Sequence, residues 1–322
     1  MSWYCPRCHG ALRIHGGRLA CAGCGRSYPL RDGLPVFCRP QPSPALLEEL
    51  ERATRRRAFE DAASRCCRRH DLARRSASPG LGAFLPVRGA ARVLEWGEGV
   101  GDEALALSSQ ASEIACLVPD LATGLVLSRR LAAERVSNVS VAIGDCQLLP
   151  ISDGFFQAVM IGAGFASRWR PGQLRTVAAE LARVIEPGGC ALLGLSRPWS
   201  GLAARWSPAA ETLDCAARRR RAGAAFGLEA LSGCMQACGF SAPELLAPLP
   251  HARLPRYVVC LDEPAGLRYL LGLMHRDRPR DAALASLAPA LLTPRRLAAL
   301  APDLLCLFTR LAGIGQASRR QP

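Results

Sequence analysis

The sequence predicts an α/β protein in which a doubly wound, mostly parallel sheet follows a small cysteine-rich unit. Apolar runs alternate with helical segments over residues 91 to 249, and this alternation is typical of parallel strands joined by helices. A turn with three glycines at alternate positions directly follows the first apolar run. Two C-x-x-C pairs lie close to the start of the chain. Together these features divide the chain into a small N-terminal unit and a large α/β domain.

Length and composition allow one large domain and a small one, because the chain has 322 residues, 49% of them hydrophobic. No apolar run approaches the ~18 residues that are needed to span a bilayer. The N-terminal sequence MSWYCPRC lacks the apolar core of a signal peptide. We therefore expect a soluble, cytoplasmic protein without a transmembrane segment. The sequence does not specify an oligomeric state.

The charge is strongly basic: the formal net charge is +14, and all 41 basic residues are Arg. Runs of Arg occur over residues 55–57, 65–75 and 218–221. Because guanidinium groups pair well with phosphate and carboxylate, these runs favour RNA, an anionic surface or an acidic substrate as partner. A solvated Arg-rich surface explains the same composition equally well.

The cysteine-rich unit occupies residues 1–38 and contains two C-x-x-C pairs about a dozen residues apart, Cys5, Cys8, Cys21 and Cys24. Four thiolates complete the tetrahedral shell of zinc, so the spacing predicts a closed, structural zinc site. So short a segment also needs a metal to hold it together. A redox pair or plain buried cysteines are the alternatives. His9, His15 and Cys38 are expected to lie outside the metal shell.

A linker and helices are expected over residues 39–90, between the zinc-binding unit and the domain at residues 91–322. Residues 39–45 are proline-rich, and residues 45–75 have the composition of one or two helices. In the domain, the apolar runs predict strands at residues 92–96, 113–118, 139–143, 156–161, 190–195 and 244–249. Helices are expected at residues 102–109, 121–135, 171–185 and 228–238, and an insertion at 196–227.

The expected site lies where the first three strands end. Gly97, Gly99 and Gly101 follow the first strand, which contains Glu95 near its end; two further acids, Asp120 and Asp145, follow the second and third strands. Carboxyl ends of parallel strands meet at one edge of a sheet, where nucleotide-like cofactors bind, and an acid at the position of Asp120 suits ribose hydroxyls. A dinucleotide-type G-x-G-x-x-G turn would need glycine at position 102, which is Asp.

The acid and glycines, E-x-G-x-G-x-G, resemble the first motif of class I S-adenosylmethionine (AdoMet) methyltransferases. Residues 144–156 and 181–189 also resemble later motifs of that family. The resemblance implies a Rossmann-like, seven-stranded, mostly parallel sheet. It implies that AdoMet is held by Glu95, Gly97, Gly99, Gly101, Asp120, Asp145 and Cys146. Two departures are Cys146, where the family has Ala, and Gln157, where it has Asp.

Two further segments carry a resemblance. Residues 26–37 (RSYPLRDGLPVF) are similar to the tail of a zinc ribbon that is fused in front of bacterial methyltransferases. Residues 249–262 and 301–308 resemble the C-terminal part of bacterial polysaccharide-associated methyltransferases. That resemblance implies a closing strand at residues 303–309 and a helical insertion at about 250–302. Residues 257–261 are the competing candidate for the closing strand.

These features predict an AdoMet-dependent methyltransferase whose acceptor is a glycan or a small molecule. The alternatives are an RNA methyltransferase that binds RNA through the ribbon and Arg residues, and a non-catalytic binding protein, for which Cys146 and Gln157 leave room. After the fourth strand the sequence has no Asn/Asp-Pro-Pro-Tyr and no Pro-Cys motif, which argues against the commonest methylations of bases. No catalytic residue is identified. His251 and Tyr257 are candidates to assist the acceptor.

Overall fold

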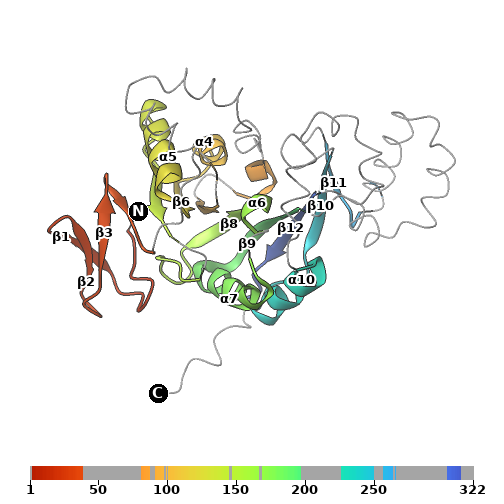
Figure 1. Cartoon of the computed structure of the whole chain (residues 1–322). Helices are drawn as coiled ribbons and strands as arrows, with labels where there is room; N and C mark the ends of the chain where they lie inside the picture. Colours follow the sequence, from red (N-terminus) through yellow and green to blue (C-terminus); the bar gives the residue numbers. More distant parts are fainter. Residues whose placement is uncertain are drawn as a thin grey trace, which may run out of the picture.

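A computed structural model describes residues 2–38, 81–87, 91–97, 99, 101–144, 147–166, 169–196, 226–249, 257–263, 265 and 303–312. The predicted linker and helices of residues 39–75, Asp145, Cys146, His251, the Arg runs and most of the insertions at 196–227 and 250–302 lie outside the described residues. The described part contains two sheets, a small one and a large one (Figure 1). None of its helices is long and apolar enough to cross a membrane.

The small sheet is an antiparallel meander formed by β1 (Leu12–His15), β2 (Arg18–Cys21), β3 (Ser27–Arg31) and β4 (Leu34–Pro35). Gly16 and Gly17 have φ values of 54° and 72°, which glycine adopts without strain, and they form the turn between β1 and β2. The buried core of this unit contains Cys5, Leu19, Cys21 and Tyr28 and little else. We call residues 2–38 the ribbon.

The large sheet has the order β11-β10-β12-β9-β8-β5-β6-β7. Its strands are β5 (Arg92–Trp96), β6 (Glu113–Val118), β7 (Val139–Ile143), β8 (Phe156–Ile161), β9 (Ile185–Ser196), β10 (Glu244–Leu249), β11 (Tyr257–Cys260) and β12 (Asp303–Thr309). Strands β5, β6, β7, β8 and β9 pair in parallel with one another, whereas β12 pairs antiparallel with both β9 and β10. The predicted Rossmann-like, mostly parallel sheet is therefore confirmed.

The choice between the two candidate closing strands is resolved in favour of residues 303–309. Strand β12 lies between β9 and β10 and buries successive residues on both faces, including Leu304, Leu305 and Phe308. Such a continuous apolar run is typical of a strand covered on both sides. The shorter strand β11 pairs only with β10 among the described strands, so it adds an eighth, edge strand to the seven that were expected.

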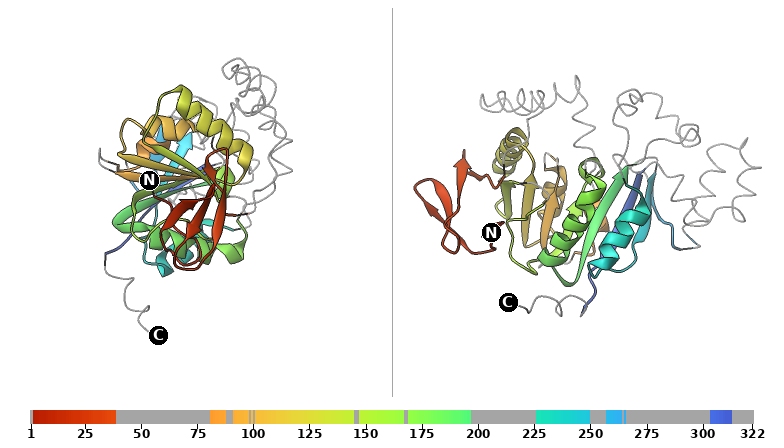
Figure 2. Two further views of the ribbon diagram at one scale, coloured as in Figure 1. Left: turned by 90° about the vertical axis from the view of Figure 1, so that its left-hand side faces the viewer. Right: turned by 60° about the horizontal axis from the view of Figure 1, so that its bottom comes forward.

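Helices cover both faces of the sheet (Figures 1 and 2). On one face, α4 (Asp102–Leu107) and α5 (Leu121–Ala133) share an apolar core with β6 and β7. On the other, α7 (Leu174–Val184) and α10 (Leu228–Ala237) share a core with β8 and β12. Short elements η1 (Leu81–Phe84), α6 (Ala163–Ala166) and η2 (Pro171–Gln173) complete the described part. This arrangement confirms the predicted doubly wound architecture.

One predicted boundary was wrong. We expected the sequence Glu186-Pro187-Gly188-Gly189 to end a helix, with a strand beginning at residue 190. In the structure α7 already ends at Val184, and β9 begins at Ile185, which pairs with Phe156. The register then shifts, and Gly188 adopts a φ of 85° within the irregularity. The glycines therefore form a bulge inside a long strand. Sequence periodicity does not distinguish such a bulge from the end of a helix.

A buried ionic network fixes the segment that follows β7. The Arg183 guanidinium donates to both carboxylate oxygens of Glu180, at 2.9 and 2.7 Å, and to Asp153 at 2.9 Å. It also donates to the carbonyl oxygens of Leu149 and Ile151. Because Arg183 is only 6% exposed, these partners replace the water it has lost. The network attaches residues 149–153 firmly to α7.

Candidate cofactor and metal sites

The glycine turn follows β5, and its backbone passes close to neighbouring side chains at two of its glycines. Gly101 has a φ of 95°, and a Cβ atom there would overlap the Leu127 side chain of α5. A Cβ atom at Gly99 would lie 2.5 Å from Oε1 of Glu95. At Gly97 an added Cβ would meet only ordinary contacts, the nearest at 3.6 Å to Phe165. The turn therefore keeps its backbone close to the Glu95 carboxylate.

Glu95 presents a partly buried carboxylate at the carboxyl end of β5. It pairs across the sheet with Cys116 of β6, whose thiol donates to Oε2 at 3.6 Å. Burial raises the pKa of the Glu95 carboxyl to about 7, and the nearby Glu103 carboxylate acts in the same direction against the hydrogen bond from Cys116. A carboxylate in this state is stabilised by a cationic group placed beside it. The sequence did not point to Cys116, because only strand register brings it to Glu95.

Asp120 lies at the end of the neighbouring strand, where it caps α5. One of its carboxylate oxygens accepts from the Thr123 backbone N–H at 2.9 Å and the other from the Thr123 hydroxyl at 2.7 Å. The residue is 4% exposed. Each carboxylate oxygen has a further lone pair, so the cap leaves acceptor capacity for ribose hydroxyls. The predicted role in ribose binding remains a prediction.

The four ribbon cysteines converge as predicted. Their Sγ atoms all lie within 4.8 Å of one another, with 3.6 Å between Cys5 and Cys24 and 3.4 Å between Cys8 and Cys21. Zinc–sulfur bonds of ~2.3 Å in a tetrahedron place the sulfurs about 3.8 Å apart, so the donor set fits zinc. In the described part of the chain no His, Asp or Glu joins this group, and His15 is exposed.

Thiol chemistry in the cluster also favours a cation. Burial raises the pKa of Cys5, but hydrogen bonds with the Tyr28 hydroxyl, 3.2 Å away, and with backbone groups outweigh burial and lower it to about 6. At Cys8, a backbone hydrogen bond from Gly10 lowers the pKa, but the neighbouring Cys21 thiol reverses this and raises it to about 12. The Cys5 thiolate forms readily and the Cys8 thiolate does not, because hydrogen bonds with the neighbouring cysteine sulfurs favour the protonated Cys8 thiol. A divalent cation removes that penalty.

Comparison with known families gives both units an identity. Residues 93–189 match the family model described as "Methyltransferase domain", and residues 4–33 match the model described as "Trm112p-like protein". Residues 93–189 are a methyltransferase domain. The predicted class I methyltransferase domain and zinc ribbon are thereby confirmed, whereas the comparisons give no support to the polysaccharide-associated resemblance.

Two curated relatives match about a third of the chain. The ubiquinone/menaquinone biosynthesis C-methyltransferase of Dinoroseobacter shibae is 30% identical over 33% of this chain and 42% of its own length. The demethylmenaquinone methyltransferase of Thermus thermophilus is 35% identical over 30% of this chain and 44% of its own length. The chain thus spans less than half the length of either relative. A solved structure shows a complex between the Haloferax volcanii Trm112 methyltransferase activator and a methyltransferase. One chain of it aligns with this chain at a TM-score of 0.43 and 16% identity, and the alignment covers 84% of this chain and 100% of that chain.

The third predicted acid of the methyltransferase domain, Asp145, and its neighbour Cys146 lie outside the described residues. The chain enters this region at Gly144, whose N–H donates to the Val118 carbonyl at 3.0 Å. A Cβ atom at Gly144 would lie 2.5 Å from Leu117, so the backbone passes close to β6. The carboxyl ends of β5, β6 and β7 are neighbours in the sheet, as the predicted site requires.

Asp120→Asn separates the capping role of Asp120 from its predicted cofactor role. Asn is as good an N-cap as Asp, so the melting temperature should stay close to that of the parent protein. Loss of a charged acceptor for ribose hydroxyls should weaken AdoMet binding by about tenfold, because hydrogen bonds to charged groups contribute ~1.5–3 kcal/mol. Calorimetric titration with AdoMet measures this. Thr123→Val is the matched control: it removes the hydroxyl contact and keeps the carboxylate, so an equal loss of affinity there would contradict the ribose assignment.

An aromatic cluster lies beside the glycine turn of the methyltransferase domain, and sequence motifs gave no sign of it. Trp96 ends β5, and its ring centroid lies 5.9 Å from Trp169 and 6.0 Å from Phe165. Phe226 stacks on Trp169 at 6.5 Å. Neither buried indole N–H has a hydrogen-bond partner among the described residues. The cluster occupies the region after β8, where no catalytic signature was found.

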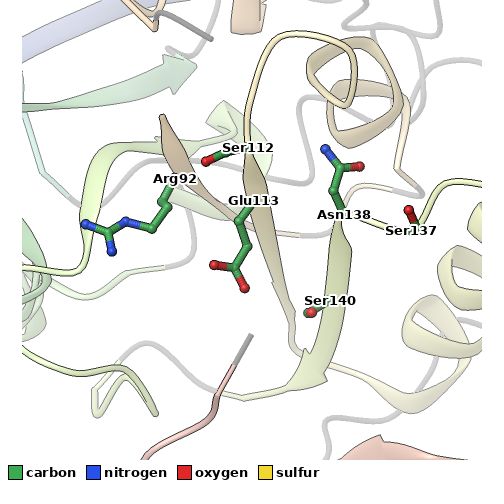
Figure 3. Close-up of a pocket in the computed structure, with 6 residues that line it drawn as sticks. All are labelled: Arg92, Ser112, Glu113, Ser137, Asn138 and Ser140. Atoms are coloured by element: carbon green, nitrogen blue, oxygen red, sulfur yellow. The ribbon is translucent and has the colours of Figure 1, made fainter. Parts of the chain in front are cut away.

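A polar pocket of about 280 Å³ lies at the opposite, amino-terminal edge of the same strands (Figure 3). It is lined by Arg92, Ser112, Glu113, Ser137, Asn138 and Ser140. The Asn138 amide donates to the carbonyl oxygens of Ser108 and Ala111, and the Ser112 hydroxyl donates to that of Ala91. These groups connect loops to one another, and the pocket is remote from the glycine turn. We assign it a structural role.

Proposed function

We propose that the protein is an AdoMet-dependent methyltransferase that acts on a small, partly apolar acceptor. The observation that carries the proposal is the glycine turn packed against the Glu95 carboxylate, at the carboxyl ends of β5 and β6, inside a segment that matches a methyltransferase domain. That edge of a doubly wound sheet is where a nucleoside cofactor binds. The donor set therefore fits AdoMet, which has a cationic amino group, ribose hydroxyls and an adenine.

The residues would divide the work of binding the cofactor. Glu95 takes the methionine amino group, whose positive charge relieves the cost of the buried carboxylate. The glycines allow the cofactor to approach the backbone, Asp120 accepts from the ribose, and Asp145 accepts from the adenine amino group. When bound, AdoMet supplies an electrophilic methyl group on a sulfonium.

The chain's contribution to the transfer itself would be to hold an acceptor O, N or C atom in line with that methyl group. Proximity and alignment alone can lower a barrier by up to ~7–11 kcal/mol. No catalytic base is needed for this part of the rate enhancement. The absence of a recognised catalytic motif after β8 is therefore compatible with activity.

The acceptor class rests on the names of the curated relatives. The aromatic cluster of Trp96, Phe165, Trp169 and Phe226 is part of the buried core, and its rings pack on one another. One curated relative is named a ubiquinone/menaquinone biosynthesis C-methyltransferase and the other a demethylmenaquinone methyltransferase. We therefore favour a small aromatic acceptor over a glycan.

A second candidate is a macromolecular acceptor, RNA or protein, because residues 4–33 match a Trm112p-like module and the net charge is +14. RNA binding through Arg–phosphate contacts must weaken steeply with salt, since each neutralised phosphate releases counterions. A basic chain without an RNA site binds only weakly and only at low salt. We expect the second behaviour.

The test begins with calorimetric titration of the purified full chain with AdoMet and, as control, with NAD. We expect AdoMet binding and no NAD binding; the reverse would favour a dehydrogenase. Radiolabelled methyl transfer is then assayed with a lipid extract rich in demethylated quinones, total RNA and a glycan extract, each at ~50–200 mM salt. Labelling confined to the RNA or glycan fraction would overturn the small-molecule assignment. AdoMet binding without transfer to any fraction would favour a non-catalytic binding protein.

A further inference from the structure

The Glu95 carboxylate has a hydrogen-bond donor in the neighbouring strand to which the proposed function assigns no role. Glu95 of β5 and Cys116 of β6 are direct partners in the parallel register, and the Cys116 thiol donates to Oε2 of Glu95 at 3.6 Å. Cys116 is 0% exposed, so its thiol cannot donate to solvent instead. The strand pairing therefore directs this thiol to the carboxylate.

Packing alone does not require a thiol at residue 116. Ile114, Cys116 and Val118 alternate along β6, and all three belong to the apolar core that the sheet shares with α4 and α5. A branched apolar side chain fills this core two residues before and two residues after the cysteine. Free Cys packs as a small apolar residue but adds a weak S–H donor. At residue 116 that donor meets a carboxylate, so the residue type has a consequence beyond packing.

The two carboxylate oxygens of Glu95 have different neighbours. Oε2 accepts from Cys116 on the β6 side. Oε1 lies at the glycine turn, 2.5 Å from the position that a Cβ atom of Gly99 would take. The backbone N–H of Ala104, in α4, also interacts with the carboxylate. Because the thiol holds Oε2, Oε1 is the oxygen that lies beside the backbone of the turn.

The surroundings of Glu95 oppose its ionisation, and the thiol acts against them. Burial raises the pKa of Glu95, and the carboxylates of Glu103 and Asp102, both in α4, act in the same direction. Asp102 is also paired with Arg130 of α5. The hydrogen bond from Cys116 lowers the pKa of Glu95, because a donor stabilises the ionised acceptor. Burial and the Glu95 carboxylate raise the pKa of Cys116 well above its ordinary value, so the thiol stays protonated and remains a donor.

We propose that Cys116 is a positioning residue: its thiol orients the Glu95 carboxylate towards the glycine turn and favours the ionised form. The consequence for AdoMet rests on the proposed function, since it requires Glu95 to hold the methionine amino group. The effect on Glu95 itself does not rest on it, because that effect is present in the ligand-free protein. The two parts can therefore fail separately.

The test compares two substitutions in the full chain. Cys116→Val keeps an apolar side chain of similar size and removes the donor, whereas Cys116→Ser keeps a donor. Cys190→Val is the matched control, since Cys190 is a buried thiol of the same apolar core, in β9, whose pKa is raised by burial. Removing the Cys116 thiol should raise the pKa of Glu95 by a further unit or about that, the effect of one weak hydrogen bond to a charged group.

The first measurement is the melting temperature of the ligand-free protein as a function of pH. A folded-state pKa above the ordinary value means that stability is lost as pH rises through it, so a higher pKa increases that loss. Cys116→Val should therefore be destabilised relative to the parent mainly above about pH 7. The same substitution in a Glu95→Gln background should show no such pH dependence.

The other variants decide whether Cys116 does more than pack. Cys190→Val should keep the pH profile of the parent, and Cys116→Ser should lie closer to the parent than Cys116→Val does. If Cys116→Val loses the same stability at every pH, or if the loss persists unchanged in the Glu95→Gln background, the residue only packs and the proposal is wrong.

The second measurement is calorimetric titration with AdoMet at about pH 6 and about pH 9. At the lower pH the ionised fraction of Glu95 falls about tenfold for each unit by which its pKa rises, and at the higher pH ionisation is nearly complete. The dissociation constant of Cys116→Val should therefore exceed that of the parent about tenfold at the lower pH and much less at the higher one.

The outcomes of this titration separate the two parts of the proposal. A shifted stability profile with an unchanged dissociation constant, or with an equal rise at both pH values, would overturn the link between Glu95 ionisation and the cofactor. A parent protein that binds no AdoMet would overturn the proposed function together with that link, and the stability profile would still decide the role of Cys116.

Discussion

Cys5→Ser/Cys21→Ser is expected to abolish zinc binding and unfold the ribbon, because it removes one ligand from each C-x-x-C pair. The parent protein should contain about one zinc per chain and the variant none. The ribbon's buried core is built around Cys5, Leu19, Cys21 and Tyr28, which is too little apolar area to hold some 37 residues. In small zinc modules, metal binding supplies apparent free energies of roughly 10–16 kcal/mol to folding.

Metal analysis of the purified protein measures the zinc, and rapid proteolysis within residues 2–38 reports the unfolding. Cys38→Ser is the control, since Cys38 lies in the ribbon but outside the cluster. It should keep its zinc and its resistance to protease. Zinc retained in the double variant, or lost in Cys38→Ser, would show that the metal is held elsewhere.

AdoMet affinity is expected to depend steeply on pH below neutrality. The Glu95 carboxyl has a pKa of about 7 and must be ionised to hold the methionine amino group. Below that value, each further pH unit lowers the ionised fraction of Glu95 about tenfold. The dissociation constant of AdoMet should therefore rise roughly 100-fold between pH 8 and pH 5. Calorimetric titration across this range measures it. Glu95→Gln should bind weakly at every pH, and a variant that kept the parent's pH profile would contradict the assignment.

The stability of the ligand-free protein should fall as pH rises, whereas its AdoMet affinity should increase. The folded-state pKa of Glu95 lies above the ordinary value of 4.5, so this group contributes stability that is present below about pH 4.5 and is lost as pH rises through 7. The ligand-free protein should therefore lose melting temperature over this interval relative to Glu95→Gln. AdoMet should raise the melting temperature most at the alkaline end, where the carboxylate is ionised.

Much of the fold could be predicted because its signals are local. Apolar runs bounded by Gly, Pro and Asp located β5, β6, β7, β8 and β10 at their observed limits. Where a residue's role depends on its partner strand, prediction failed. The sequence predicts that Gly188 and Gly189 stop a helix, but they lie in a bulge of β9. The bulge occurs because Ile185 pairs with Phe156 whereas Cys190 pairs with Ala158, so the register shifts between these pairs.

The candidate site shows the same limit. The order of acids and glycines located Glu95, Gly97, Gly99, Gly101 and Asp120, because a turn after a strand is encoded by adjacent residues. Cys116 and the aromatic cluster were missed, since the residues come from different strands and loops and meet only through sheet register. The second role of Asp120, capping α5, also emerged only from the structure.

The position of β12 in the sheet determines the order in which the last strands can pair during folding. Among the described strands, β10 joins the rest of the sheet through β12, which lies between it and β9 and comes more than fifty residues later in the sequence. During synthesis, β10 must wait for β12 to emerge from the ribosome before it can pair with the sheet. Until then the edge of β9 stays open, and such unpaired edges are the sites where partly folded chains associate. The last described strand is therefore the one that closes the nascent protein against misassembly.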